Sequence, residues 1–522
     1  MTTTRRRRAL VLIAASILSL AIWELAARLG LSRLGVIAPP SAVVVEIVQN
    51  ASLYGVNFAS TAWVAIRGWF WGDLAAIVLA VLFVQFRVVE RLLQQLALVL
   101  YCLPLVAVMP LLQLTFDPDT ARVVLAALSV FFTTLVGTML GLRSADRGQL
   151  TVVRALGGGP FAALRFVRMP SGIPAVLTGL QIGAAAATLG AVFGEFIGAD
   201  RGLGVLLING LQQLHLAQVF AVAVLATAMA GIPYGLLGIA RRVLVPWSTG
   251  LSTAAAARPT RTSAVRRVLG ALGWAVTSLA IVIGAWWLYL VVFAVTPFVG
   301  KTPVAVFDYL VLVPDASRNR SELIDALGVT LVHAGVGYAA GLAVGILVAT
   351  VFVLAPPLEL AFTPLTVALR SVPIVALIPV LLVVFGRGLP GVIAITTIVT
   401  FFPTLANVQQ GMSRVPADAL LLMRSYDASL AQTLWRLRLP TALPTIFASA
   451  RIAAPAAVLG ATLAEWLATG DGLGHMIVVS RSFSNYNQLW AAAMLLAAVS
   501  VVFYSIVSAA ERAVLSRFTV AR

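Results

Sequence analysis

Long apolar stretches alternate with short polar segments along the whole chain. In the first half they cover about residues 9–29, 59–86, 91–114, 120–142, 172–198 and 217–240, and in the second about 268–295, 326–354, 360–385, 389–411, 441–469 and 487–510. Most are close to the roughly 20 residues that an α-helix needs to cross a bilayer. The pattern predicts an all-α polytopic membrane protein with about twelve transmembrane helices, six in each half.

The chain also contains an internal duplication. A stretch of about fifty residues recurs with no insertion or deletion, because each position in the first copy lies 270 residues before its counterpart. The matched pairs include Arg154 and Arg424, Pro170 and Pro440, Pro174 and Pro444, Glu195 and Glu465, and Gly202 and Gly472. Two similar halves predict two helical bundles that face each other across a pseudo-twofold axis, with the handled molecule between them.

Charge distribution indicates how these bundles are oriented. Only 11% of residues are charged, 61% are hydrophobic, and the net charge is +17. The arginines lie mostly in alternate loops rather than in one patch, so they predict topology by the positive-inside rule and argue against nucleic acid as a partner. We expect a multi-pass protein of the cytoplasmic (inner) membrane, with both termini in the cytoplasm and membrane lipid around it.

A polar segment separates the halves. Residues 247–267 are rich in Ser, Thr, Ala and Arg and contain Pro259, which is typical of a linker. The predicted domains are therefore 1–246 and 268–522, joined by a cytoplasmic linker over 247–267. A connection on the cytoplasmic side keeps both halves in the same orientation, so we expect parallel repeats.

The sequence offers little for catalysis or cofactor binding. Its one cysteine, Cys102, and its three scattered histidines form no metal-ligand pattern. The only segment that resembles a phosphate loop, Gly300-Lys301-Thr302, has Val295 where the first glycine is needed. We therefore expect no catalytic residue, no metal and no cofactor in this chain.

Prolines and polar groups inside predicted helices are candidates for a translocation pathway. Proline bends a membrane helix, and a charge at membrane depth is costly enough to suggest a function. These candidates are Tyr101, Pro104, Pro110 and Gln181 in the first half, and Arg370, Ser371, Pro373, Pro379 and Arg451 in the second. Arginine binds oxyanions well, which favours a small anion as the solute. The alternatives are packing kinks for the prolines and pairing with carboxylates or carbonyls for the arginines.

Two acidic residues are expected near the outer ends of the fifth helices. Glu195 and Glu465 lie some 25 residues beyond Pro170 and Pro440. They are candidates for an outer gate or for contact with a substrate-binding protein. Capping of the glycine-rich loops that follow them is an equally good interpretation.

The loops around residues 154–168 and 424–438 carry a further signal. Residues 153–167 form a short basic, partly apolar segment interrupted at 157–160, which suits docking of a soluble partner or an interfacial helix on lipid. The spacing of Gly157, Val167 and Met169-Pro170 resembles the cytoplasmic loop signature of binding-protein-dependent ABC importer permeases. Leu369-Arg370-Ser371-Val372-Pro373, Phe401-Phe402-Pro403-Thr404 and Gly472-Leu473-Gly474 resemble the nitrate, sulfonate and taurine branch.

The match to that signature is incomplete. The opening Glu-Ala-Ala of the family falls on Thr151-Val152-Val153 and Leu421-Leu422-Met423, and the signature glycine is Asp427 in the second copy. The resemblance implies a type I importer fold with two fused permease units. It also implies ATPase-coupling residues, which are Arg154, Ala155, Leu156, Gly157, Val167, Met169 and Pro170 in the first loop and Arg424, Asp427, Leu437, Leu439 and Pro440 in the second.

The same resemblance implies the partners. Two ABC ATPase subunits, expected as a homodimer, bind ATP and Mg and grip the two loops, while an extracytoplasmic substrate-binding protein or lipoprotein delivers a small solute. The solutes of relatives include sulfonates, nitrate, taurine and vitamin precursors. Two alternatives stay open at this point: a twelve-helix ion-coupled secondary transporter, which needs midplane carboxylates or histidines, and a membrane scaffold or channel without a transport cycle.

Overall fold

The computed structural model describes residues 17–18, 20–25, 27–31, 38–196, 198–213, 215–245, 264–359, 362 and 374–519. Every regular element in these ranges is helical. In the first half they are η1 (Ala27–Leu31), α2 (Pro40–Gln49), α3 (Ala51–Gln85), α4 (Arg87–Cys102), α5 (Leu105–Gln113), α6 (Pro118–Arg143), α7 (Arg147–Ala155), α8 (Pro160–Ala163), η2 (Leu164–Arg168), α9 (Met169–Glu195), α10 (Leu203–Gln212) and α11 (Leu216–Leu244).

The second half repeats this order of elements. Its helices are α12 (Ala264–Val292), α13 (Pro303–Val311), α14 (Ala316–Leu354), α16 (Ile374–Phe385), α17 (Leu389–Ser413), α18 (Ala417–Ser425), α19 (Leu430–Thr433), η4 (Leu434–Arg438), α20 (Leu439–Ala464), η5 (Glu465–Thr469), α21 (Gly472–Ser482) and α22 (Tyr486–Thr519). The equivalent pairs include α3 and α14, α6 and α17, α7 and α18, α9 and α20, and α11 and α22. The predicted all-α, two-repeat architecture is confirmed.

Eight helices among the described residues are long and apolar enough to cross a membrane. They contain α3, α6, α9, α11, α14, α17, α20 and α22, and each coincides with a predicted span. A ninth predicted span, 91–114, is a bent pair formed by α4 and α5. The remaining three predicted spans, 9–29, 268–295 and 360–385, fall wholly or partly outside the described residues or side chains. The total of twelve therefore stays a prediction.

Two of the helices are longer than predicted. α3 begins at Ala51 rather than near 59, and α14 begins at Ala316 rather than near 326. The added turns of α14 are polar, and Arg318 pairs there with Glu322 at 2.9 Å. A hydropathy pattern detects only the apolar part of a helix, so extensions beyond the bilayer escape it.

Small residues allow the helices of each half to approach closely. A side chain on Gly68 or Gly72 of α3 would collide with Ala126 or Ala127 of α6. In the second half, Gly341 of α14 packs directly against Thr400 of α17. Membrane helices associate largely through such packing, because lipid offers no hydrophobic driving force between them. The glycines shared by α3 and α14 therefore set the same helix–helix geometry twice.

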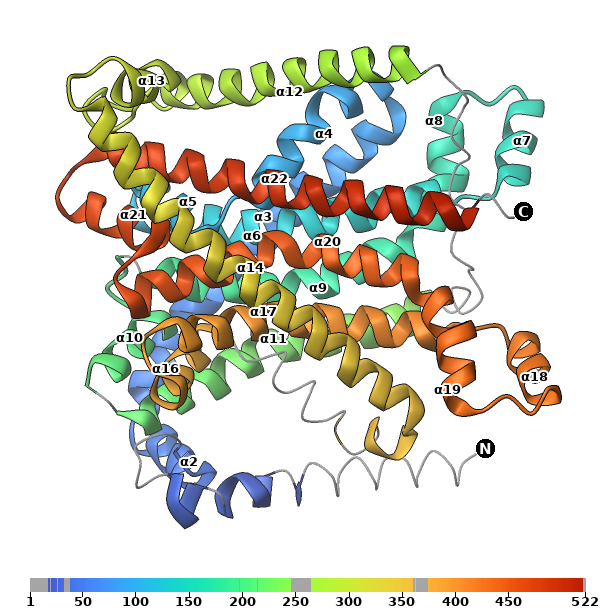
Figure 1. Cartoon of the computed structure of the whole chain (residues 1–522), viewed down its shortest axis with the longest axis horizontal. Helices are drawn as coiled ribbons and strands as arrows, with labels where there is room; N and C mark the ends of the chain where they lie inside the picture. The colour runs from blue at the N-terminus through green and yellow to red at the C-terminus, as the bar shows by residue number, and fades with distance from the viewer. Residues whose placement is uncertain are drawn as a thin grey trace.

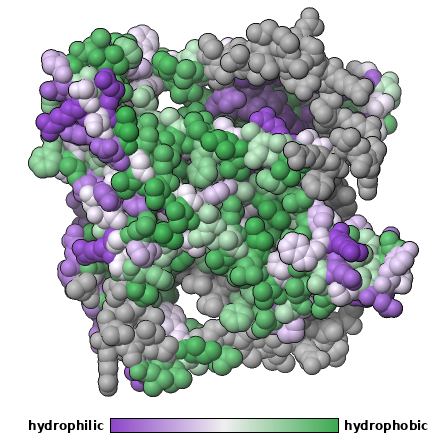
Figure 2. Space-filling model, viewed as in Figure 1, coloured by the Kyte–Doolittle hydropathy of each residue, from purple (hydrophilic) through white to green (hydrophobic). Residues whose placement is uncertain are grey.

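The spanning helices lie side by side, and the connecting elements gather at their two ends (Figure 1). The helices α7, α8, α18 and α19 lie at one end, on the right of the view, which we call the α7/α18 end. The helices α10, α13, α16 and α21 lie at the opposite end, called the α10/α21 end. Figure 2 shows an apolar surface between these two ends and hydrophilic residues concentrated at them. This arrangement fits two parallel repeats in a bilayer.

The first described helix of the second half, α12, crosses to the first half. It packs against α4, and Phe293 just beyond its end lies edge-on to Phe116, with ring centroids 4.9 Å apart. Tyr289 of α12 also forms a hydrogen bond with Thr115. The two halves are therefore interlocked rather than merely adjacent.

Pro104 lies at the break between α4 and α5. The axes of the two helices differ in direction by 102°. A proline at the start of a helix has no N–H to satisfy, and the residue before it avoids helical dihedral angles, so the chain turns here. Pro110 instead lies inside α5, which continues through it.

Candidate functional site

The two predicted coupling loops share one backbone geometry. α7 and α18 both end in a turn whose last residue is left-handed, with φ +77° at Gly157 and +47° at Asp427. The N–H groups of these residues donate to the carbonyls of Arg154 and Arg424, both at 3.0 Å. Glycine occupies a left-handed position without strain, and Asp tolerates it better than most residues. The glycine that is missing from the second loop has therefore not altered its fold.

The proline of each signature also has a structural role. A single π-helical turn precedes both Met169-Pro170 and Leu439-Pro440, namely η2 and η4. Because the proline nitrogen cannot donate a hydrogen bond, the regular helical ladder is interrupted there, and π turns accommodate such interruptions. The predicted interfacial segment over 153–167 is thus two elements, α7 and the combined α8–η2, and the latter runs directly into α9.

Large apolar side chains protrude from both turns. Leu156 is 82% exposed and its counterpart Tyr426 is 79% exposed. Phe161, Phe166, Leu430 and Trp435 are also exposed. Among the predicted coupling residues, Arg154, Ala155, Gly157, Met169, Pro170, Arg424, Asp427 and Pro440 are exposed, Val167 is buried, and Leu437 and Leu439 are partly buried. Exposed apolar groups rimmed by arginines are typical of a protein-binding surface.

Glu195 is almost completely buried at the α10/α21 end, with 1% of its surface exposed. Its Oε2 accepts hydrogen bonds from Thr61 Oγ1 at 3.0 Å and from the N–H of Gly204 at 2.8 Å. The Thr61 hydroxyl in turn accepts from the N–H of Leu203 at 2.8 Å. The carboxylate thus fastens the start of α10 to the middle of α3.

Glu465 repeats this arrangement in the second half. Its Oε2 accepts from Thr330 Oγ1 at 3.0 Å and from the N–H of Gly474 at 2.9 Å. A further partner, His333, places its Nδ1 3.0 Å from Glu465 Oε1. A side chain on Gly472 would lie 2.3 Å from the carboxylate carbon of Glu465, so only glycine fits this approach. These contacts favour the interpretation that both glutamates cap the following loops.

Aromatic residues next to the two glutamates meet where the halves join. Phe196 follows Glu195, Trp466 follows Glu465, and their ring centroids lie 6.2 Å apart. Phe193 also contacts Trp466, with centroids 5.9 Å apart. Because Phe196 and Trp466 are equivalent residues, their contact marks the pseudo-twofold axis. Sequence reasoning missed this pair, although the offset of 270 residues that relates the glutamates also relates these neighbours.

Tyr101 lies at a second contact between the halves. Its hydroxyl donates to the carbonyl of Ile452 in α20 at 3.3 Å, and its ring stacks on Phe132 of α6 with centroids 4.0 Å apart. Pro104 and Pro110 are buried close by in sequence. Pro379 lies in the backbone of α16, whereas Arg370, Ser371 and Pro373 lie outside the described residues. The structure therefore brings Tyr101 to α20, one residue from Arg451.

Arg451 pairs with a carboxylate, as one of the alternatives above anticipated. Its Nη1 lies 2.9 Å from Glu511 Oε2 of α22. Its equivalent Gln181 is buried within the first half, near Gly238 of α11. Arg451 and Gln181 thus face α22 and α11, their own neighbours in each half.

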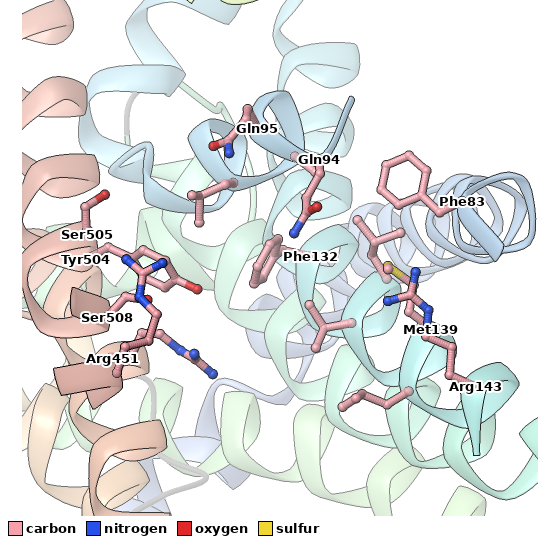
Figure 3. Close-up of a pocket in the computed structure, with 16 residues that line it drawn as sticks. Phe83, Gln94, Gln95, Phe132, Met139, Arg143, Arg451, Tyr504, Ser505 and Ser508 are labelled. Carbon is pink, nitrogen blue, oxygen red and sulfur yellow. The ribbon is translucent and has the colours of Figure 1, made fainter. Parts of the chain in front are cut away.

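Arg451 also borders a cavity of about 500 Å³ between the halves. Figure 3 shows Arg451, Tyr504, Ser505 and Ser508 on one wall, and Arg143, Met139 and Phe83 on the other. Gln94 and Gln95 of α4 lie between these walls. The cavity combines polar groups from α20 and α22 with residues of α3, α4 and α6.

Asp73 is a buried carboxylate that sequence reasoning did not single out. It lies within α3 and is 3% exposed. Its Oδ1 accepts a hydrogen bond from Thr134 Oγ1 at 2.6 Å, and Gly183 of α9 lies against it. Leu342 occupies the equivalent position in the second half, so this carboxylate belongs to the packing of α3, α6 and α9 in one half alone.

Comparison with known proteins gives the family. The family described as "Binding-protein-dependent transport system inner membrane component" matches the chain twice, at residues 72–250 and 341–519. A riboflavin transport system permease protein of Chloroflexus aurantiacus is 36% identical over 147 residues, which is 28% of this chain and 54% of that protein. A putative aliphatic sulfonates transport permease protein of Bacillus subtilis is 29% identical over 239 residues, which is 45% of this chain and 84% of that protein.

A formylaminopyrimidine transport permease protein of Halalkalibacterium halodurans is 32% identical over 157 residues, or 30% of this chain and 63% of that protein. The two family matches together cover more than half of the chain and coincide with the two structural repeats. The chain therefore belongs to the binding-protein-dependent inner membrane components, the permease subunits of ABC importers, which work with ATPase subunits and substrate-binding proteins, and it contains that permease unit twice.

Proposed function

We propose that this chain forms the complete transmembrane path of an ATP-driven importer and moves a small solute inward by alternating access. The observation that supports this most strongly is the contact of Phe196 with Trp466, because equivalent residues can meet only on the axis between two facing halves. A path on that axis lies between the bundles of residues 1–246 and 268–522, with 247–267 as the linker.

The α7/α18 end is the cytoplasmic end in this proposal. Its arginines support that orientation by the positive-inside rule, and it places both chain termini in the cytoplasm. Two ATPase subunits, proposed as a homodimer, dock on the exposed apolar side chains around Leu156 and Tyr426. ATP and Mg bind to those subunits. Closure of the ATPases then pulls the two turns together and rocks the halves.

The α10/α21 end is the outer mouth and receives a substrate-binding protein. Phe193, Phe196 and Trp466 close the axis there. Glu195 and Glu465 act behind this seal by holding α10 and α21 to α3 and α14. The proposed outer gate thus consists of the aromatic residues, with the glutamates positioning them.

The pathway below the seal passes along the contact between α4 and α20. Tyr101, Pro104 and Pro110 lie on its first-half side, and Arg451 lies beside it in the second. Pro379 belongs to it through α16, and Gln181, Arg370, Ser371 and Pro373 remain proposed members.

The solute is proposed to be a small organic or inorganic anion, such as a sulfonate or nitrate, or a vitamin precursor. The names of the relatives include sulfonates, taurine, nitrate, riboflavin and formylaminopyrimidine. All of them are small polar molecules, which suits a path between two helical bundles.

Reconstitution tests this function. The chain is placed in proteoliposomes with its ATPase and binding protein, and uptake of radiolabelled candidate solutes is measured with and without ATP. We expect uptake only when ATP, ATPase and binding protein are all present. Uptake by the chain alone, driven by a proton or sodium gradient, would establish the secondary-transporter alternative instead.

A further inference from the structure

The cavity beside Arg451 does not lie on the axis of transport. A path on a twofold axis is lined by equivalent elements from both halves. This cavity is lined by α3, α4 and α6 from the first half but by α20 and α22 from the second, which are equivalent to α9 and α11. It is therefore a side cavity of the interface, and a hydrophilic hollow is visible on the corresponding face, at the upper right of Figure 2.

We propose that this cavity binds the headgroup of an anionic phospholipid. Its ligand chemistry is that of a phosphate monoanion, and the membrane is the source of that phosphate. Basic cavities between transmembrane helices on the cytoplasmic side are suited to such headgroups. The inference depends on the orientation of the chain in the bilayer but not on the identity of the solute.

The charges of the cavity favour one negative group. Three arginines line it: Arg143, Arg451 and Arg512. Arg143 pairs with Glu90 at 2.6 Å and Arg451 pairs with Glu511 at 2.9 Å. In the part of the chain that the structure describes, no carboxylate lies within ion-pair distance of Arg512. These five groups together leave one positive charge, which a phosphodiester headgroup neutralises.

The lining is amphipathic in the way that a lipid requires. Arg143 ends α6, and its partner Glu90 lies in the first turn of α4. The arginines therefore lie toward the α7/α18 end, at the level of the predicted cytoplasmic interface. Phe83, Leu135 and Val136 line the same cavity, so apolar surface adjoins the charged groups. A soluble anion has no use for this apolar wall, whereas the acyl chains of a lipid cover it.

The site is specific to one side of the protein. The residues 270 positions from Arg143 and Arg451 are Ser413 and Gln181. Ser505 and Ser508 likewise correspond to Gly235 and Gly238, and only Arg512 has an arginine counterpart, Arg242. The equivalent position on the other side thus lacks two of the three arginines and both serines. We expect one tightly held anionic lipid per chain.

Lipid titration of the purified full chain tests the proposal. The protein in detergent is titrated with phosphatidylglycerol or phosphatidylcholine, and binding is read from native mass spectra and from the melting temperature. Each arginine near an anionic surface contributes enough to change affinity about fivefold. We expect phosphatidylglycerol to bind more tightly than phosphatidylcholine, and R512Q and R451Q each to weaken it about fivefold.

Control variants separate lipid binding from a folding defect and from solute binding. R318Q removes an exposed arginine from the α10/α21 end and is expected to leave phosphatidylglycerol affinity unchanged. R512Q disturbs no ion pair among the described residues, so it keeps the test valid if R451Q folds poorly. Equal phosphatidylglycerol affinity in wild type, R512Q and R451Q would overturn the proposal. Arginine-dependent binding of inorganic phosphate or ethanesulfonate, with no preference between the two lipids, would identify a solute site and overturn it too.

Discussion

Phe196 and Trp466 occupy equivalent positions in the two halves, and their rings meet with centroids 6.2 Å apart. If this contact closes the outer mouth, it must break when the halves rock. The double variant F196C/W466C, made in a C102S background, is therefore expected to react with a short bifunctional thiol reagent in the resting state. Trapping the ATPases with ATP and vanadate should reduce that cross-linking at least severalfold.

The single-cysteine variants serve as controls for non-specific reaction. Cross-linking that is equally efficient in the resting and trapped states would show that this contact does not open during transport.

The approach of Gly472 to Glu465 makes a second prediction. G472A places a methyl group 2.3 Å from the carboxylate carbon and also strains a backbone with φ +82°. Overpacking costs about 1–3 kcal/mol and a left-handed alanine about 1–2 kcal/mol. We therefore expect the free energy of unfolding to fall by about 2–4 kcal/mol, measured by denaturant unfolding in detergent.

Gly470 provides the matched control for that experiment. It also has positive φ, +75°, but a methyl group added there would have its nearest outside atom 4.0 Å away, on His475. G470A should therefore show only the backbone cost of about 1–2 kcal/mol. Equal losses for G470A and G472A would contradict the role assigned to Glu465.

The shared left-handed turn predicts how the second coupling loop responds to mutation. D427G should keep ATP-driven uptake within about twofold of wild type, because glycine fits φ +47° without strain. D427V should impair uptake strongly, because a β-branched residue resists this conformation. G157V should behave like D427V. The measurement is uptake together with solute-stimulated ATPase activity, and a harmful D427G would mean that the aspartate itself contacts the ATPase.

The ion pair between Arg451 and Glu511 predicts a modest coupling energy. The two side chains are 34% and 15% exposed, so solvent screens the pair in part. A double-mutant cycle with R451Q, E511Q and the double variant should give about 0.5–1 kcal/mol. The free energy of unfolding in detergent supplies the four values. A coupling energy near zero would show that Arg451 is not held by Glu511 in solution.

Much of this architecture follows from sequence because its signals are local. Each spanning helix is marked by its own apolar run, and the offset of 270 residues reveals the duplication without any knowledge of contacts. The glycines of α3 and α14 are visible in the same way, since close helix packing needs small residues at fixed intervals. The duplicated Met169-Pro170 and Leu439-Pro440 likewise indicate matching loops.

The remaining features depend on contacts between distant segments. Phe196 and Trp466 look like ordinary apolar residues until the halves are brought face to face. Arg451 looks like a bare charge at membrane depth until Glu511, on another helix, is placed beside it. Asp73 was missed for a related reason: its partner Thr134 lies 61 residues away on α6. Pairing of this kind leaves no periodic trace in a sequence.

The crossing of α12 onto the first half has a consequence for how such a chain diverges. Two separate permease polypeptides are free to exchange partners, so every surface between them must tolerate each possible pairing. A tethered chain whose second half already clasps the first has a single pairing to satisfy. That freedom accounts for the differences between equivalent positions, such as Val64 against His333 and Gln181 against Arg451. Fusion turns a symmetric machine into one whose two sides can take on separate duties.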